Sequence, residues 1–415
     1  MKNSQPTNSS YKWLVVFMLW FVCFFNYADR QAISAILPKL EEEFRFTKTQ
    51  QGLIGSAFMW VYAGCALLAG YAGDRMRRKD LILGGCLFWS AVTALTGWCS
   101  RFWHFIAVRA LEGFGETFYF PASMSLLSDY HGPRTRSRAL SLHQSSVYIG
   151  TIAGSWLGAV FAQAYGWRSG FYFFGAAGML LALVLFFVLR EPRRGASEST
   201  PPAPEPREAF GPSLAKIVSA PAVPLLMLAF VCANSIATVF LTWTPTFLFE
   251  KFHFKLSTAG LNGAVYIQFA SALGAPIGGL LADRWAHRGS GRVGVQALGL
   301  LLGAGFIFLI GMTRDVTTLL IAMTCFGFFK GLYDSNIFAA LYDYVAPSHR
   351  ALAAGLMNTV GWGAGALGPL AVGWLADHGR HSDKMENMSE AIAYGGIVYL
   401  VGAGVLIGAV VRVRK

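Results

Sequence analysis

The sequence predicts an all-α integral membrane protein with twelve transmembrane helices in two pseudo-symmetric six-helix bundles. Three observations lead to this prediction. The chain of 415 residues is 54% hydrophobic and only 13% charged, with a mean hydropathy of +0.47, which is too apolar for a soluble protein of this length. Apolar windows of about 20 residues recur along the whole chain. Two sequence patterns of the first half return in the same order in the second half.

The apolar windows follow one another with short connections, and each is long enough to span a bilayer. The first carries Asp29 and Arg30 and lacks a small-residue cleavage site, so we interpret it as a membrane helix and not as a signal peptide. The predicted helices lie at 13–37, 50–73, 81–99, 103–128, 138–164, 169–189, 222–249, 257–282, 293–312, 316–343, 350–376 and 391–411.

A break in composition separates the sixth window from the seventh. Arg190-Glu191-Pro192-Arg193-Arg194 opens a stretch rich in Pro, Ser, Ala and Glu, which cannot bury a core and is typical of a flexible linker. We therefore expect a first bundle at 1–190, a cytoplasmic linker at 191–218 and a second bundle at 219–415.

The net charge of +12 is explained better by membrane topology than by nucleic-acid binding. About 21 of the 34 Lys and Arg residues fall in loops on the side of the N-terminus and about 10 on the opposite side, as the positive-inside rule requires of a cytoplasmic N-terminus. We expect a multi-pass protein of the cell (inner) membrane with both termini cytoplasmic, and no nucleic-acid partner.

Enzymatic and metal chemistry are not indicated by any pattern in the sequence. The six cysteines lie in apolar segments without metal-ligand spacing, which predicts neither disulfides nor a metal site. We find no phosphate loop and no nucleophile–base motif, so we predict no enzyme and no cofactor.

The internal repeat rests on two pairs of helix ends. Gly70-Tyr71-Ala72-Gly73-Asp74-Arg75 ends the second window, and Gly279-Leu280-Leu281-Ala282-Asp283-Arg284 ends the eighth. Ser128-Asp129-Tyr130 ends the fourth, and Tyr342-Asp343-Tyr344 ends the tenth. Two signals in register at matching ends are typical of parallel repeats about an axis along the membrane normal.

These patterns resemble a known family of transporters. Gly70-Tyr71-Ala72-Gly73-Asp74-Arg75-Met76-Arg77-Arg78-Lys79 is similar to the signature loop of the major facilitator superfamily, and the resemblance covers essentially the whole chain. The resemblance implies the major facilitator fold and secondary active transport by alternating access, in a protein that we expect to be a monomer.

Two branches of that family fit the sequence. Asn26-Tyr27-Ala28-Asp29-Arg30-Gln31, Gly113-Phe114-Gly115-Glu116 and Arg190-Glu191-Pro192 resemble the spinster-like transporters. The Asp29-Arg30 pair, Arg109 seven residues before Glu116, Pro121 and Trp243-Thr244-Pro245-Thr246-Phe247-Leu248 also resemble the anion:cation symporters, which move sugar acids and other organic anions with protons or sodium. The fifth window lacks the G-P-x-x-G element of drug/proton antiporters, which disfavours drug efflux.

Ionisable residues inside the apolar windows mark the predicted site, because a charge at membrane depth is retained mainly where it serves transport. Arg109, Glu112 and Glu116 lie on one face of the fourth helix. We expect Asp29 to pair with Arg109 while ionised and to release it when protonated, and the resemblance to the symporters makes all four residues candidate proton sites. Glu116 has no basic residue within its own turn, so loss of water should favour its neutral form. The alternatives are a packing ion pair at Asp29 and a packing hydrogen bond at Glu112.

Arg30 is then free to bind an anionic head group with two parallel hydrogen bonds. Lys330 takes the place of Glu116 in the second half, and Asp334 follows one turn later and is placed to pair with it, for binding or only for structure. The other polar candidates for the substrate site, each of which can alternatively form an interhelical hydrogen bond, are Tyr27, Tyr62, Gln144, Tyr148 and Asn358.

Charges at the cytoplasmic helix ends are interpreted as a latch that stabilises an outward-open state. The predicted latch residues are Gly70, Asp74, Arg75, Arg78, Asp129 and Arg138, repeated more weakly by Asp283 and Arg284.

The sequence therefore favours proton-coupled symport of a small organic anion, such as a sugar acid or another carboxylate. The alternative is a spinster-like, proton-linked carrier of a lysophospholipid or a sphingoid lipid. Sodium in place of protons stays open, and the partners expected are the substrate, the coupling ion and the bilayer.

Overall fold

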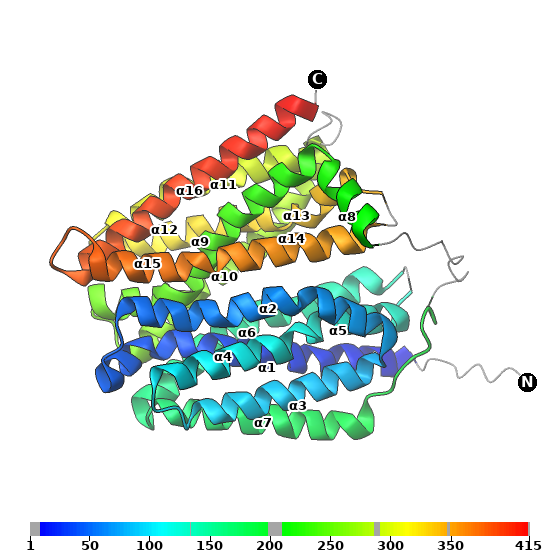
Figure 1. Cartoon of the computed structure of the whole chain (residues 1–415), viewed down its shortest axis with the longest axis horizontal. Coiled ribbons are helices and arrows are strands. Elements are labelled where there is room, and N and C mark those ends of the chain that lie inside the picture. Colours follow the sequence, from blue (N-terminus) through cyan, green and yellow to red (C-terminus); the bar gives the residue numbers. More distant parts are fainter. Residues whose placement is uncertain (1–8, 133, 198–209, 286–290, 347–348, 414–415) are drawn as a thin grey trace, which may run out of the picture.

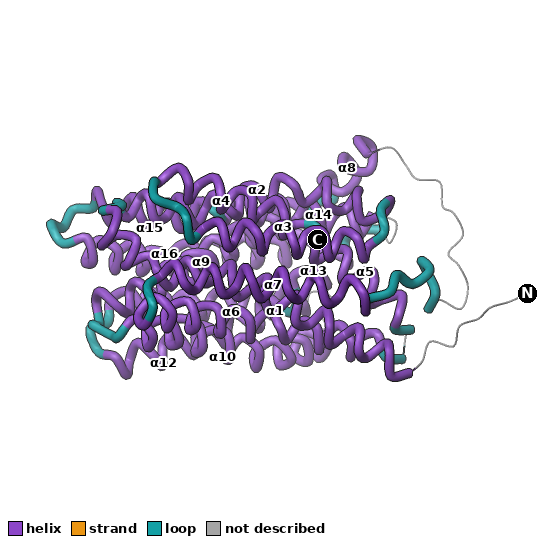
Figure 2. The backbone as a smooth tube through the Cα atoms, turned by 90° about the horizontal axis from the view of Figure 1, so that it is seen from below, coloured by secondary structure: helices purple, strands orange, loops and turns teal. Residues whose placement is uncertain are grey.

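The chain folds into a bundle of helices that run along one long axis (Figures 1 and 2). The computed structural model describes residues 9–132, 134–197, 210–285, 291–346 and 349–413, and every regular element in this part of the chain is a helix. The helices of the first half are α1 (Ser9–Phe44), α2 (Lys48–Arg75), α3 (Arg78–Thr96), α4 (Phe102–Thr117), α5 (Tyr119–Tyr130), α6 (Arg136–Ala164) and α7 (Trp167–Val188). Those of the second half are α8 (Phe210–Ser219), α9 (Ala222–Lys251), α10 (Leu256–Trp285), α11 (Gly291–Met312), α12 (Val316–Asp334), α13 (Ile337–Asp343), α14 (Arg350–Gly365), α15 (Leu367–His378) and α16 (Lys384–Val413).

The predicted membrane crossings match these helices. Within the described residues, nine helices are long and apolar enough to cross a membrane, by length and composition. The other three predicted crossings are α3 and two pairs of shorter helices, α4–α5 and α14–α15.

Prolines explain where these two pairs break. Pro121 has no N–H to donate to the carbonyl of Thr117, and Thr117 is the last residue of α4. Pro369 likewise cannot donate to Gly365, where α14 ends. Both crossings therefore consist of two helical pieces, which expose backbone carbonyl groups near the middle of the bundle.

Small residues set the distance between α1 and α6. A methyl group added at Gly150, Gly154 or Gly158 would meet the backbone of Phe24, Ala28 or Ala32 on α1, one helical turn apart each time. This stripe of small residues lets the two backbones approach closely, which is how membrane helices gain packing energy without water to drive them together.

The two halves repeat features that the sequence did not single out. Arg45 in the α1–α2 connection has φ 57°, and His253 in the α9–α10 connection has φ 54°, each between two phenylalanines. Arg78 at the start of α3 forms an ion pair with Asp129, and Arg292 at the start of α11 forms one with Asp343 at 2.5 Å. The equivalent positions hold equivalent geometry, as a parallel repeat requires.

We call the end of the bundle that holds the α1–α2 and α15–α16 connections the far end, and the opposite end, which holds α8 and the start of α1, the linker end (Figure 1). At the far end the halves are joined by charges. Lys48 Nζ lies 2.6 Å from Glu41 Oε2 on α1 and 2.6 Å from Glu250 Oε1 on α9. The Asp377 carboxylate on α15 accepts hydrogen bonds from the backbone N–H of Thr49, at 2.7 Å, and from its hydroxyl, at 2.8 Å.

This seam continues toward the middle of the bundle, where donors of the first half meet carbonyl oxygens of the second. Ser155 Oγ donates to Gly260 O at 2.7 Å, and Ser56 Oγ donates to Ala366 O at 2.5 Å, beside the α14–α15 break. The far end is therefore closed between the halves in this structure.

Candidate functional site

The ionisable residues of α1 form the centre of the site. Arg30 donates from Nη2 to Glu116 Oε2 at 2.5 Å and from Nε to the same oxygen at 2.9 Å. The Glu116 side chain is fully buried, while 13% of the Arg30 side chain stays exposed. The prediction that Arg30 is free is wrong. Glu116 has no basic residue within its own turn, but the last turn of α4 faces α1 and brings Arg30 to it across 86 residues of sequence.

Aromatic rings surround the Arg30 guanidinium. Its central carbon lies 4.5 Å from the Tyr27 ring centre, 4.6 Å from that of Phe58 and 5.2 Å from that of Tyr62. Ring faces attract cations, and the attraction grows where water is excluded. Tyr27 and Tyr62, two of the candidates named from the sequence, thus lie beside Arg30. Phe58 is an addition whose only signal was its position one turn before Tyr62.

The remaining acidic residues form a second layer behind this pair. Arg109 forms an ion pair with Glu112, three residues later on the same helix, and its guanidinium lies 4.6 Å from the Phe58 ring centre. Asp29 accepts hydrogen bonds from the Arg30 backbone N–H at 2.7 Å and from Thr93 Oγ1 at 3.2 Å. The expected Asp29–Arg109 pair is not formed, because Glu112 one turn away occupies Arg109 and α3 supplies Thr93 to Asp29.

Two buried polar atoms at the centre lack a hydrogen-bond partner among the described residues. They are Glu116 Oε1 and Asn26 Nδ2, and Asn26 Oδ1 accepts from Arg30 Nη2 at 3.3 Å. One oxygen of the Glu116 carboxylate thus carries both hydrogen bonds while the other carries none. Such a carboxylate has a position at which a proton can be added without breaking an existing hydrogen bond.

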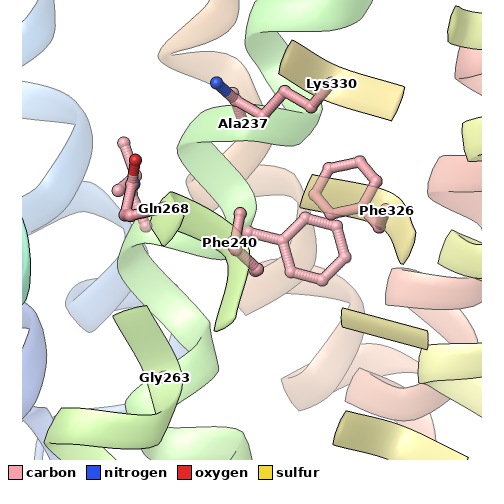
Figure 3. Close-up of a pocket in the computed structure, with 8 residues that line it drawn as sticks. Ala237, Phe240, Gly263, Gln268, Phe326 and Lys330 are labelled. Carbon is pink, nitrogen blue, oxygen red and sulfur yellow. The ribbon is translucent and has the colours of Figure 1, made fainter. Parts of the chain in front are cut away.

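The second half contributes a smaller charged pair. Lys330 and Asp334 on α12 form an ion pair, which confirms the pairing predicted from their spacing. Tyr148 on α6 of the first half lies close enough to interact electrostatically with both. In Figure 3 the Lys330 side chain runs across the pocket above the Phe240 and Phe326 rings, whose centres lie 4.6 Å apart. The pocket measures about 260 Å³, including its open part, and is otherwise lined by Ala237, Leu241, Gly263, Ile267 and Gln268.

An all-helical bundle with two charged pairs facing its interior, one in each half, agrees with the comparison with known families. The model of the Major Facilitator Superfamily matches residues 19–301 and 250–415. The chain belongs to the Major Facilitator Superfamily. It is therefore a secondary transporter of the membrane and not an enzyme.

Relatives of this transporter include anion transporters and spinster homologues. It is 29% identical to "Probable anion transporter 4, chloroplastic" of Oryza sativa subsp. japonica over 89% of its own length, and it spans 64% of that longer protein. It is 26% identical to "Protein spinster homolog 1" of Xenopus laevis, over 99% of this chain and 83% of that one. Among solved structures, a bacterial homolog of the human lysosomal transporter spinster, in an inward-facing and occupied conformation, superposes with a TM-score of 0.83 at 19% identity, over 97% of each chain. That likeness shows the fold.

Two of the predicted substrate residues of the transporter lie outside the contacts described for both Arg30 and Lys330. Gln144 on α6 and Asn358 on α14 are partly buried, and neither is among the described partners of Arg30 or Lys330. Thr93 and Asn26, which do touch the charged residues, were missed. A threonine in an apolar window carries no signal of its own, whereas Asn26 lies one turn before Arg30 and was a readable candidate.

The predicted latch residues divide into a buried pair and exposed charges. Arg78 is buried, not at the surface as predicted, because the Asp129 carboxylate and the Glu191 carboxylate, at 3.0 Å, both neutralise it. This cluster ties α3 and α5 of the first half to the start of the linker and, among the described residues, does not reach the second half. The side chain of Asp74 lies outside the described part of the chain. The exposed latch residues are Gly70, Arg75, Arg138, Asp283 and Arg284.

Proposed function

We propose that this transporter carries a small organic anion, a sugar acid or another carboxylate, together with protons. The proposed setting is the cell (inner) membrane, with both termini cytoplasmic and alternating access between the two bundles. The observation that carries the proposal is the Arg30–Glu116 pair. A buried carboxylate holds a cation that is still 13% exposed and therefore within reach of a ligand.

Charge balance links the two ions. With Glu116 ionised, the pair is neutral, and an added anion would leave an uncompensated negative charge at membrane depth, which is costly. A proton on Glu116 releases Arg30 to the substrate carboxylate, and the site stays neutral. An anion and a proton therefore favour each other's binding, which is the requirement of symport.

In this proposal the second layer supports the change of partner at Arg30 from Glu116 to the substrate carboxylate. Asp29 and the Arg109–Glu112 pair lie behind Arg30 and Glu116, and their own hydrogen bonds hold them in place. They stabilise the orientation of α1 and α4 while Arg30 changes its partner. Lys330 and Asp334 offer a second contact to the substrate from the other half, and Tyr27, Tyr62 and Tyr148 offer hydroxyl groups.

Glu116→Gln tests the proton role, because the amide mimics the protonated acid permanently. In proteoliposomes we expect counterflow of substrate to survive and accumulation driven by a pH gradient to be lost. Glu42→Gln is the control, since the Glu42 side chain is 70% exposed at the far end, and it should accumulate substrate normally. Accumulation by Glu116→Gln would contradict the proton role. Uptake driven by a sodium gradient would show that sodium, and not the proton, is the coupling ion.

A lipid substrate is the second candidate, because six of the eight residues lining the pocket in the second half are apolar or glycine. A lysophospholipid or a sphingoid lipid would place its chain against Phe240 and Phe326. Uptake of the two substrate classes, compared in the same proteoliposomes, is the discriminating measurement. A lysophospholipid that is itself taken up, while sugar acids are not, would favour this candidate.

A further inference from the structure

A proline leaves one backbone carbonyl of α9 without its helical donor. Pro245 lies inside α9 and has no N–H, so the carbonyl of Leu241, four residues earlier, lacks an intrahelical hydrogen bond. Gln31 on α1 supplies the missing donor from the other half of the molecule, with Nε2 2.5 Å from Leu241 O. Gln31 is 6% exposed, so this hydrogen bond is shielded from water.

The two ends of this hydrogen bond belong to different parts of the site. Gln31 follows Arg30 directly, and neighbouring residues on a helix point about 100° apart, so Arg30 can face Glu116 while Gln31 faces α9. Leu241 lines the pocket beside Lys330. Helix α1 thus contacts the Glu116 carboxylate through Arg30, and through the next residue, Gln31, it contacts α9 of the opposite half.

We propose that Gln31 is a positioning residue that transmits the state of the Arg30–Glu116 pair to the closure of the far end. The Leu241 carbonyl is satisfied by Gln31 when the far end is closed and by water when it is open. A shift of α1 that accompanies a change of partner at Arg30 moves Gln31 with it and weakens the closed state. The inference rests on alternating access by this transporter and not on the identity of its substrate.

Another hydrogen bond between the halves does not replace a missing helical donor, and it provides a control. Ser155 also donates across the halves, to Gly260 O. Position 264, four residues after Gly260, is an alanine, whose N–H can bond that carbonyl within α10. Loss of the Ser155 hydroxyl therefore leaves no carbonyl without a donor, whereas loss of the Gln31 amide does.

The test is a double-mutant cycle read by the distance between nitroxide labels at Arg101 and Thr317, two exposed far-end positions in opposite halves. Gln31→Leu should raise the population with a long far-end distance about tenfold, since a buried carbonyl loses its partner. Pro245→Ala restores an N–H to α9, so in that background Gln31→Leu should change the population less than about twofold. Ser155→Ala should have the same effect in both backgrounds. Gln31→Met is the substitute if Gln31→Leu does not fold.

A second pair of variants tests the link to Glu116. Glu116→Gln should raise the same population when Gln31 is present and add nothing in the Gln31→Leu background. An equal effect of Gln31→Leu with and without Pro245, or an effect of Glu116→Gln that does not depend on Gln31, would overturn the proposal. These distances are measured without substrate or an ion gradient. A negative result would therefore not bear on the proposed symport, and a negative result in the uptake assay would not bear on the role of Gln31.

Discussion

Replacing Lys48 with methionine should open the far end of the transporter. Lys48 is almost fully buried, and its Nζ lies 2.6 Å and 2.8 Å from the two carboxylate oxygens of Glu250 in the other half. Methionine keeps an unbranched side chain that is one atom shorter, but it removes the charge and all three donors. Glu41 and Glu250 then face each other without a cation, which also favours separation of the halves.

The magnitude follows from what breaks when the far end opens. Of the hydrogen bonds made by the Lys48 side chain, only the two to Glu250 cross between the halves, since Glu41 moves with Lys48. Hydrogen bonds to charged groups contribute roughly 1.5–3 kcal/mol each, and the 26% exposure of the Glu250 side chain reduces this, so we take about 2 kcal/mol for the pair. At about 1.4 kcal/mol per factor of ten, the ratio of open to closed states should rise roughly 30-fold.

The assay is the rate of maleimide labelling at Thr242→Cys in detergent, in a variant without the native cysteines. Thr242 is 2% exposed and lies against Gly55 of the first half, so it becomes reactive when the far end opens. Lys39→Met is the matched control, because Lys39 pairs with Glu42 on the same exposed helix face and should change the rate less than about twofold. An unchanged rate in Lys48→Met, or an equal rise in both variants, would refute the reasoning.

Two further predictions concern stability, read as the thermal unfolding midpoint in detergent. Arg78→Met leaves the Asp129 and Glu191 carboxylates without their cation and should lower the free energy of unfolding by about 3–5 kcal/mol. The control is Arg292→Met at the equivalent, more exposed position, which should lower it by less than about 1 kcal/mol. Equal falls in the unfolding midpoint of the two variants would contradict the argument from burial. Burial lowers the pKa of His131, in the α5–α6 connection, so the unfolded chain binds a proton there more readily and stability should fall as the pH drops below about 6.5. His131→Gln should flatten that fall, and an unchanged slope would show that other groups cause it.

Features that depend on neighbours along the chain were predicted well. A helix long enough to cross a bilayer must be apolar over its whole length, so the windows identified the crossings, and the charges of Lys330 and Asp334 identified their own pair at i and i+4. The effect of proline is local too, since α4 and α14 end four residues before Pro121 and Pro369. These are local consequences of side-chain chemistry and backbone geometry.

For the charged centre, the sequence identified the residues of the site but not which of them form pairs. The sequence indicated that Asp29, Arg30, Arg109, Glu112 and Glu116 belong to one site, because each is an expensive residue within an apolar window. It paired Asp29 with Arg109, whereas the structure pairs Arg30 with Glu116 and Arg109 with Glu112. The choice among these partners depends on the rotation of α1 against α4 about their axes. The apolar pattern leaves this rotation undetermined, because the face of a membrane helix that meets lipid is as apolar as the face that packs inside the bundle.

The sequence by itself therefore determined the family, the crossings and the set of charged residues, since all of these are encoded in composition and spacing. Tertiary structure alone decided which charges meet, that Gln31 reaches the carbonyl which Pro245 leaves free, and that Lys48 joins the halves at the far end. Partners across a helix interface are 86 residues apart for Arg30 and Glu116 and 210 for Gln31 and Leu241. Contacts at such separations depend on how α1, α4 and α9 pack together, which is a property of the whole bundle and not of any one segment.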